Sequence, residues 1–222
     1  MNRKFSARAS VLLITVLMLV TLTGCGSSEA AAKTLTPKSI VEGDRTIWYM
    51  IDCGSVEDYG EEAIPLYIYI VENSHVKEYW NHALEVTMKD LAKMSDDEIT
   101  ARLEQLAKEY NEKKPDNSDI VEWDVSKIRI DVLNSDVEPT DYYSRESVSD
   151  DHIQMIIFGE LLDQPVTIAG IQYGGYYQTH DHEDYVVTKT DDNTTFGFET
   201  LDDCDETYPS TDETQGYIYL NK

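Results

Sequence analysis

The pattern of apolar residues changes near Pro115, and this change limits the chain to a mixed α+β fold. Before Pro115, apolar residues recur at the spacing of one helical face, at Ile99, Leu103, Leu106 and Tyr110. After it, they fall in short runs rich in β-branched and aromatic side chains, separated by turn residues. The sequence therefore predicts one long amphipathic helix and a β-rich remainder.

The helix is expected to cover residues 96–113. Ser95 and Glu98 form a capping box at its start, and Pro115 prevents its continuation. Acidic residues fill its first turn and Lys113 its last, which suits the helix dipole. We expect its apolar stripe to face the core and not a partner. A short helical turn is expected just before it, at 88–93.

A β-hairpin is expected on the N-terminal side of this helix. Residues 66–71 alternate between two faces, residues 72–75 have the composition of a turn, and residues 76–80 would form the return strand. Residues 46–51 would add a further strand. The hairpin and the helix together define an N-terminal lobe at 46–114.

Residues 115–222 are expected to form a β-rich lobe, as an antiparallel β sandwich or an open barrel. Its expected strands are 120–125, 127–133, 152–158, 166–173, 184–190, 195–199 and 216–220. Residues 134–151 are acidic and read as an exposed loop.

Residues 1–24 have the regions of a secretory signal peptide. Three bases precede residues 11–22, which are almost wholly apolar and too few for a membrane span of about 20 residues. Leu22-Thr23-Gly24-Cys25 then forms a bacterial lipobox, which predicts diacylglycerol transfer to the Cys25 thiol and cleavage before it. We expect a protein anchored by this lipid at the extracytoplasmic face of the cell membrane, with a flexible tether at 25–45.

Three stretches carry a family resemblance: Thr46-Ile47-Trp48-Tyr49, the hairpin segment 68–73, and the segment 91–99 with Met94-Ser95-Asp96-Asp97-Glu98-Ile99. Together they resemble a group of uncharacterised small surface lipoproteins of Gram-positive bacteria. The resemblance covers about residues 46–100. It implies a surface lipoprotein and assigns no catalytic residue, because the group has no established activity.

The charge of the chain restricts its partners. The formal net charge is −25, and removal of residues 1–24, which hold three bases and no acid, would make it −28. Phosphate binding needs a basic surface, so nucleic acid is not expected as a partner. A basic partner would suit the charge, but a solvated acidic surface explains it more simply.

After Cys25, the remaining cysteines are Cys53 and Cys204. Export permits a disulfide between them, and the alternative is two separate thiols. The acids on both sides of Cys204 disfavour its thiolate, which argues against nucleophilic catalysis there.

Two segments are candidates for function. Tyr173, Tyr176 and Tyr177 surround Gly174-Gly175 and would offer aromatic faces to a protein or a cell-wall glycan, unless they lie in the core. His180 and His182 would point to one side of a strand and, with a third ligand from elsewhere, could bind a metal ion, as in a metal-dependent hydrolase, but a polar hairpin tip without a metal fits this segment better. The sequence shows no catalytic motif and implies no cofactor, so a non-catalytic binding module is the leading interpretation.

Overall fold

The computed structural model describes residues 33–113, 121–126, 128–133, 159–178, 183–209 and 214–220. The helices are α2 (Pro37–Glu42), α3 (Cys53–Tyr59), α4 (Asn81–Leu84), α5 (Met88–Ala92) and α6 (Asp96–Lys113), with short 3-10 helices η1 (Gly60–Glu62) and η2 (Leu201–Asp203). The strands are β1 (Lys33–Leu35), β2 (Thr46–Asp52), β3 (Tyr67–Glu72), β4 (His75–Trp80), β5 (Glu122–Val125), β6 (Ile128–Leu133), β7 (Glu160–Leu161), β8 (Val166–Ile168), β9 (Ile171–Gln178), β10 (Asp184–Lys189), β11 (Thr194–Phe196), β12 (Glu206–Pro209) and β13 (Thr214–Leu220).

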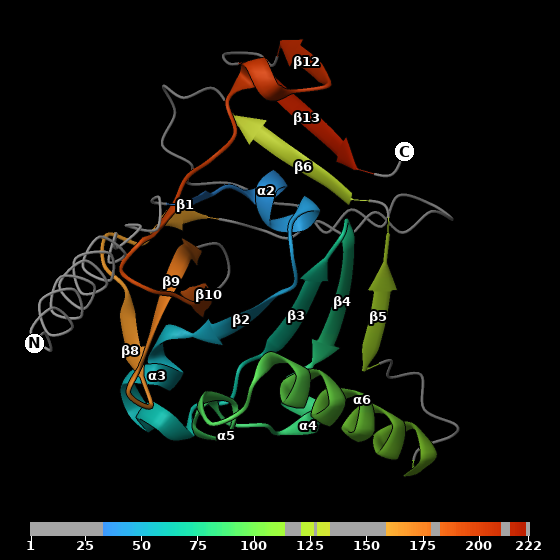
Figure 1. Cartoon of the computed structure of the whole chain (residues 1–222), viewed down its shortest axis with the longest axis vertical. Helices are drawn as coiled ribbons and strands as arrows, with labels where there is room; N and C mark the ends of the chain where they lie inside the picture. Colours follow the sequence, from blue (N-terminus) through green and yellow to red (C-terminus); the bar gives the residue numbers. More distant parts are fainter. Residues whose placement is uncertain are drawn as a thin grey trace, which may run out of the picture. The chain divides into compact units, whose positions relative to one another are not determined.

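An open sheet of eight antiparallel strands organises this part of the chain. Its order is β5-β4-β3-β2-β10-β9-β7, and β8 also pairs with β9. A second sheet has the order β12-β13-β6, and β1 pairs with β11 in parallel (Figure 1). The α+β class predicted from the sequence is confirmed.

The large sheet is buried on both faces because its central strands alternate between two hydrophobic clusters. In β2, Ile47, Tyr49 and Ile51 belong to the first cluster, whereas Trp48 belongs to the second. The sequence of such a strand is a continuous apolar run, because neither of its faces is exposed to solvent.

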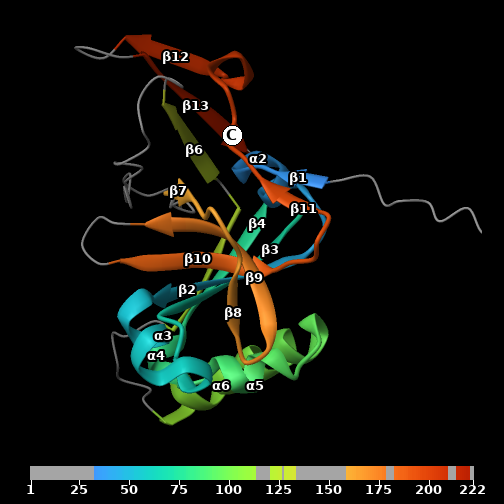
Figure 2. The same ribbon diagram turned by 90° about the vertical axis from the view of Figure 1, so that its left-hand side faces the viewer.

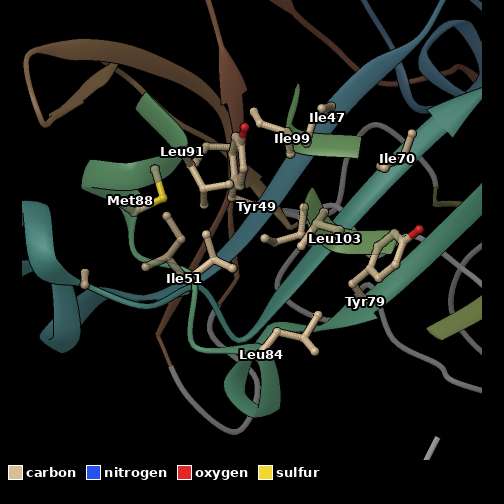
Figure 3. Packing of buried hydrophobic residues seen from close by; sticks show 14 of the residues in the cluster. Ile47, Tyr49, Ile51, Ile70, Tyr79, Leu84, Met88, Leu91, Ile99 and Leu103 are labelled. Carbon is tan, nitrogen blue, oxygen red and sulfur yellow. The ribbon is translucent and has the colours of Figure 1, made fainter. Parts of the chain in front are cut away.

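Helices α4, α5 and α6 cover the first face. Ile99 and Leu103 of α6 and Leu91 of α5 point at Tyr49 and Ile51 of β2 (Figure 3). The stripe of the predicted helix therefore packs in the core, as expected.

Polar contacts also join the helices to this sheet. The Lys189 ammonium, from β10, donates to the carbonyl oxygens of Leu91 and Met94 at 3.2 and 3.0 Å. Arg45 contacts Glu72 of β3 and Asp97 of α6. These contacts hold the end of α5 and the start of α6 in place.

The second face is covered by α2, β1 and the three-stranded sheet (Figure 2). Ile40 and Val41 of α2 pack there with Ile218 and Leu220 of β13. Residues 33–42 are thus part of the fold, so the tether expected over 25–45 is wrong for its second half. The expectation failed because β1 pairs with β11, which is 161 positions away along the chain.

The two lobes expected on either side of residue 115 lie in one compact unit, Lys33–Lys222, and share one sheet. Strand β10 pairs with β2 and so joins segments from both expected lobes in one sheet. The β-rich segment 115–222 therefore forms neither a barrel nor a sandwich by itself. The segments β2 and β10 are far apart along the chain, so the local sequence pattern of either strand does not predict their pairing.

Two predicted strand regions have different outcomes. The hairpin 66–80 is confirmed, with Asn73 and Ser74 at φ 50° and 63° in a two-residue turn. The strand predicted at 166–173 is wrong, because a turn at Ala169-Gly170 divides it into β8 and β9. The strand expected at 152–158 and the loop expected at 134–151 lie outside the described residues.

Candidate functional site

Tyr173 and Tyr176, two of the three tyrosines predicted to form a ligand surface, are fully buried. Tyr173 packs edge-on against Tyr49 in the first cluster, with ring centroids 5.8 Å apart. Tyr176 packs against Trp48 and Phe198 in the second cluster, and its hydroxyl donates to the Gly197 carbonyl oxygen at 2.9 Å. The prediction is wrong for these two residues, because β9 is an interior strand.

The glycine pair between these tyrosines serves the packing of the core. A Cβ at Gly174 would lie 2.6 Å from the ring of Phe196. A Cβ at Gly175 would lie 2.4 Å from the Val186 carbonyl oxygen, and its φ of +146° disfavours other residues. These glycines allow a close approach between β9 and its neighbours, which is the structural alternative that the sequence left open.

Tyr177 differs from its neighbours because its side chain is half-exposed. It lies directly opposite Tyr185 of β10, with ring centroids 6.0 Å apart and planes tilted by 53°. On its other side it pairs with Glu160 of β7. Residues directly opposite on neighbouring strands share a face, so Glu160, Tyr177 and Tyr185 form a row across the sheet.

Two further acids act on this row: Glu183 directly precedes β10, and Glu57 lies in α3, which follows β2. The pKa of Tyr177 is raised to about 12, first by burial and then by hydrogen bonding to Glu183. Burial, Cys53, Glu57 and Glu183 raise the pKa of Tyr185. We call Tyr177, Tyr185, Glu57, Glu160 and Glu183 the Tyr177–Tyr185 surface.

Cys53 lies beside this surface, next to Tyr185 and Glu183. It begins α3, its backbone N–H donates to the Glu183 carbonyl oxygen at 2.8 Å, and its side chain is buried. Burial raises the pKa of its thiol to about 11, and the charges of Asp184, Asp52 and Glu183 also raise it, whereas the Tyr185 hydroxyl lowers it. At neutral pH the thiol stays protonated, so it is a poor nucleophile.

The disulfide predicted between Cys53 and Cys204 is not formed, and both residues are free thiols. Cys53 lies at the end of the large sheet, whereas Cys204 follows η2 and packs against Gly216 of the three-stranded sheet. Burial and then Asp203, Glu199 and Asp205 raise the pKa of Cys204, in the direction that its acidic neighbours predict.

Several predicted residues lie outside the part of the chain that the structure describes. They are Cys25, His180 and His182.

Among the described residues, no group of three or more His, Cys, Asp or Glu side chains could hold a metal ion. None of the described helices has the length and apolar character needed to cross a membrane.

The sequence did not predict that Tyr185, Glu57 and Glu160 would join Tyr177 in one surface. The position of Tyr185 opposite Tyr177 follows only from the register of the β9–β10 hairpin. The positions of Glu160 and Glu57 near these rings follow only from the order of strands in the sheet.

Comparison with known protein families, curated proteins and solved structures finds no match to this chain.

Proposed function

We propose that this protein is a lipid-anchored binding protein at the extracytoplasmic face of a bacterial membrane, without catalytic activity of its own. The observation that carries the proposal is the lipobox Leu22-Thr23-Gly24-Cys25, which ends an apolar run preceded only by basic charge. The lipid on Cys25 would hold the protein to the membrane, since two acyl chains are enough for stable anchoring.

The folded part of the chain supports a location close to the membrane. Strand β1 starts at Lys33, eight positions after Cys25. Its first residue is bound in place, because the Lys33 N–H donates to the Asn193 carbonyl oxygen at 3.0 Å and Leu35 is buried. Eight residues span at most about 29 Å, so the tether would be short.

The binding activity would use the Tyr177–Tyr185 surface. Tyr177 was expected at a ligand surface and is half-buried, and Tyr185 adds a second half-buried ring beside it. Tyrosine combines an apolar ring with a polar hydroxyl, which suits contact with a protein or a glycan. The net charge argues against nucleic acid as the ligand.

Metabolic labelling with a fatty acid tests the anchor. In a bacterial host that processes lipoproteins, the wild type should be labelled and Cys25→Ser should not. Cys53→Ser and Cys204→Ser are the matched controls and should keep the label, because both cysteines belong to the folded part. Label that persists in Cys25→Ser would contradict the proposal.

A further inference from the structure

We propose that the Tyr177–Tyr185 surface binds a lysine- or arginine-bearing segment of another protein. This inference rests on the proposed binding function and names the class of partner. Three properties of the surface carry it: the paired rings, the flanking carboxylates, and the absence of a matching base among the described residues.

The two rings form the centre of the surface. Tyr177 and Tyr185 are direct cross-strand neighbours with centroids 6.0 Å apart, and both are half-buried, Tyr185 being packed in part against the first cluster. The face of an aromatic ring attracts a cation within about 6 Å of its centroid. Two adjacent rings therefore offer a cationic side chain more favourable contact than one ring would.

Three carboxylates lie near the rings. Glu160 pairs with Tyr177 from β7, and the charges of Glu57 and Glu183 act on Tyr185. Within the described residues, none of these three glutamates has a Lys, Arg or His partner within ion-pair distance. By contrast, Glu61 and Glu62 both form ion pairs with Lys89.

The combination of rings and carboxylates favours an organic cation. A guanidinium or an ammonium on an aliphatic stem can lie on a tyrosine ring while its N–H groups donate to a carboxylate. A basic polypeptide also has the opposite charge to the whole chain, whose net charge is −25. The surface is thus complementary to a basic protein segment in both local chemistry and overall charge.

A labelled penta-lysine peptide tests this inference with the full-length protein in a neutral detergent, at about 50 mM and about 300 mM salt. Fluorescence anisotropy should show saturable binding that weakens with salt, and penta-glutamate should not bind. Tyr177→Leu should weaken binding about tenfold, whereas Tyr177→Phe, which keeps the ring, should change it less than about threefold.

Charge-matched variants separate a local surface from general attraction. Glu183→Gln should weaken peptide binding at least about threefold, and Glu112→Gln, an equal change of charge at an exposed position of α6, should leave it nearly unchanged. Equal losses in both variants, or no binding by the wild type, would overturn the inference. The comparison of Glu183→Gln with Glu112→Gln still tests the binding site if Tyr177→Leu fails to fold.

The two proposals fail separately. Loss of peptide binding in a protein that is acylated at Cys25 contradicts the partner class alone. Peptide binding by a protein that receives no lipid contradicts the anchor alone.

Discussion

At the residue scale, the tight turns between β3 and β4 and between β8 and β9 adopt the same type of backbone conformation with different residues. Both need positive φ at two successive positions. Asn73 and Ser74 supply φ of 50° and 63°, and Ala169 and Gly170 supply 51° and 77°. Ala169 is the least suited of the four, because its Cβ is strained in the left-handed region.

Ala169→Gly should therefore stabilise the protein by about 0.5–1 kcal/mol, as the relief of strain exceeds the added entropy of the unfolded chain. Ala101→Gly is the matched control, since Ala101 is exposed inside α6, and it should destabilise by about 1 kcal/mol. Urea denaturation measures both changes. Destabilisation by both substitutions would contradict the strain at Ala169.

At the element scale, α6 shows how local contacts define a helix before it packs. Ser95 Oγ accepts from the Glu98 N–H at 3.4 Å, and the Glu98 carboxylate accepts from the Ser95 N–H at 2.8 Å. The Ser95 N–H and the Ser95 hydroxyl both donate to the Glu98 carboxylate, which lowers the pKa of Glu98. Both partners lie within four residues, which explains why the sequence located the start of α6.

Ser95→Ala should destabilise the protein by about 1 kcal/mol through loss of this cap. Thr100→Ala, which removes an exposed hydroxyl one turn later, should have a smaller effect. Thermal unfolding compares the two variants, and hydrogen exchange should show faster exchange of the first-turn amides in Ser95→Ala. Equal effects of the two substitutions would argue against the cap.

At the scale of the whole molecule, the decisive contact is between β2 and β10. Strand β10 lies between β2 and β9, so the C-terminal strands continue a sheet that the N-terminal hairpin begins (Figure 1). The first hydrophobic cluster likewise combines Tyr49 and Ile99 with Tyr173 and Val187. Neither half can bury its apolar side chains alone.

A fragment of residues 116–222 should therefore not fold cooperatively. It would expose the β2-facing edge of β10 and the side chains that α6 covers. Circular dichroism during thermal unfolding measures this, with residues 33–222 as the control that should give one cooperative transition. A cooperative transition in the shorter fragment would show that residues 116–222 form an independent domain.

The sequence by itself determined the elements that short-range contacts define. Helix 96–113 and the hairpin 66–80 follow from caps, turns and periodicity within a few residues, and the structure confirms both. The helix at 88–92 was also expected. These predictions succeeded because the stabilising partners are close along the chain.

The tertiary structure alone decided what long-range contacts control. It placed Tyr173 and Tyr176 in two cores, because strands on both sides and layers on both faces enclose β9. It assembled Tyr177, Tyr185, Glu57 and Glu160 from four separate elements. Burial depends on which distant segments pack against a residue, and a local pattern carries no information about that choice.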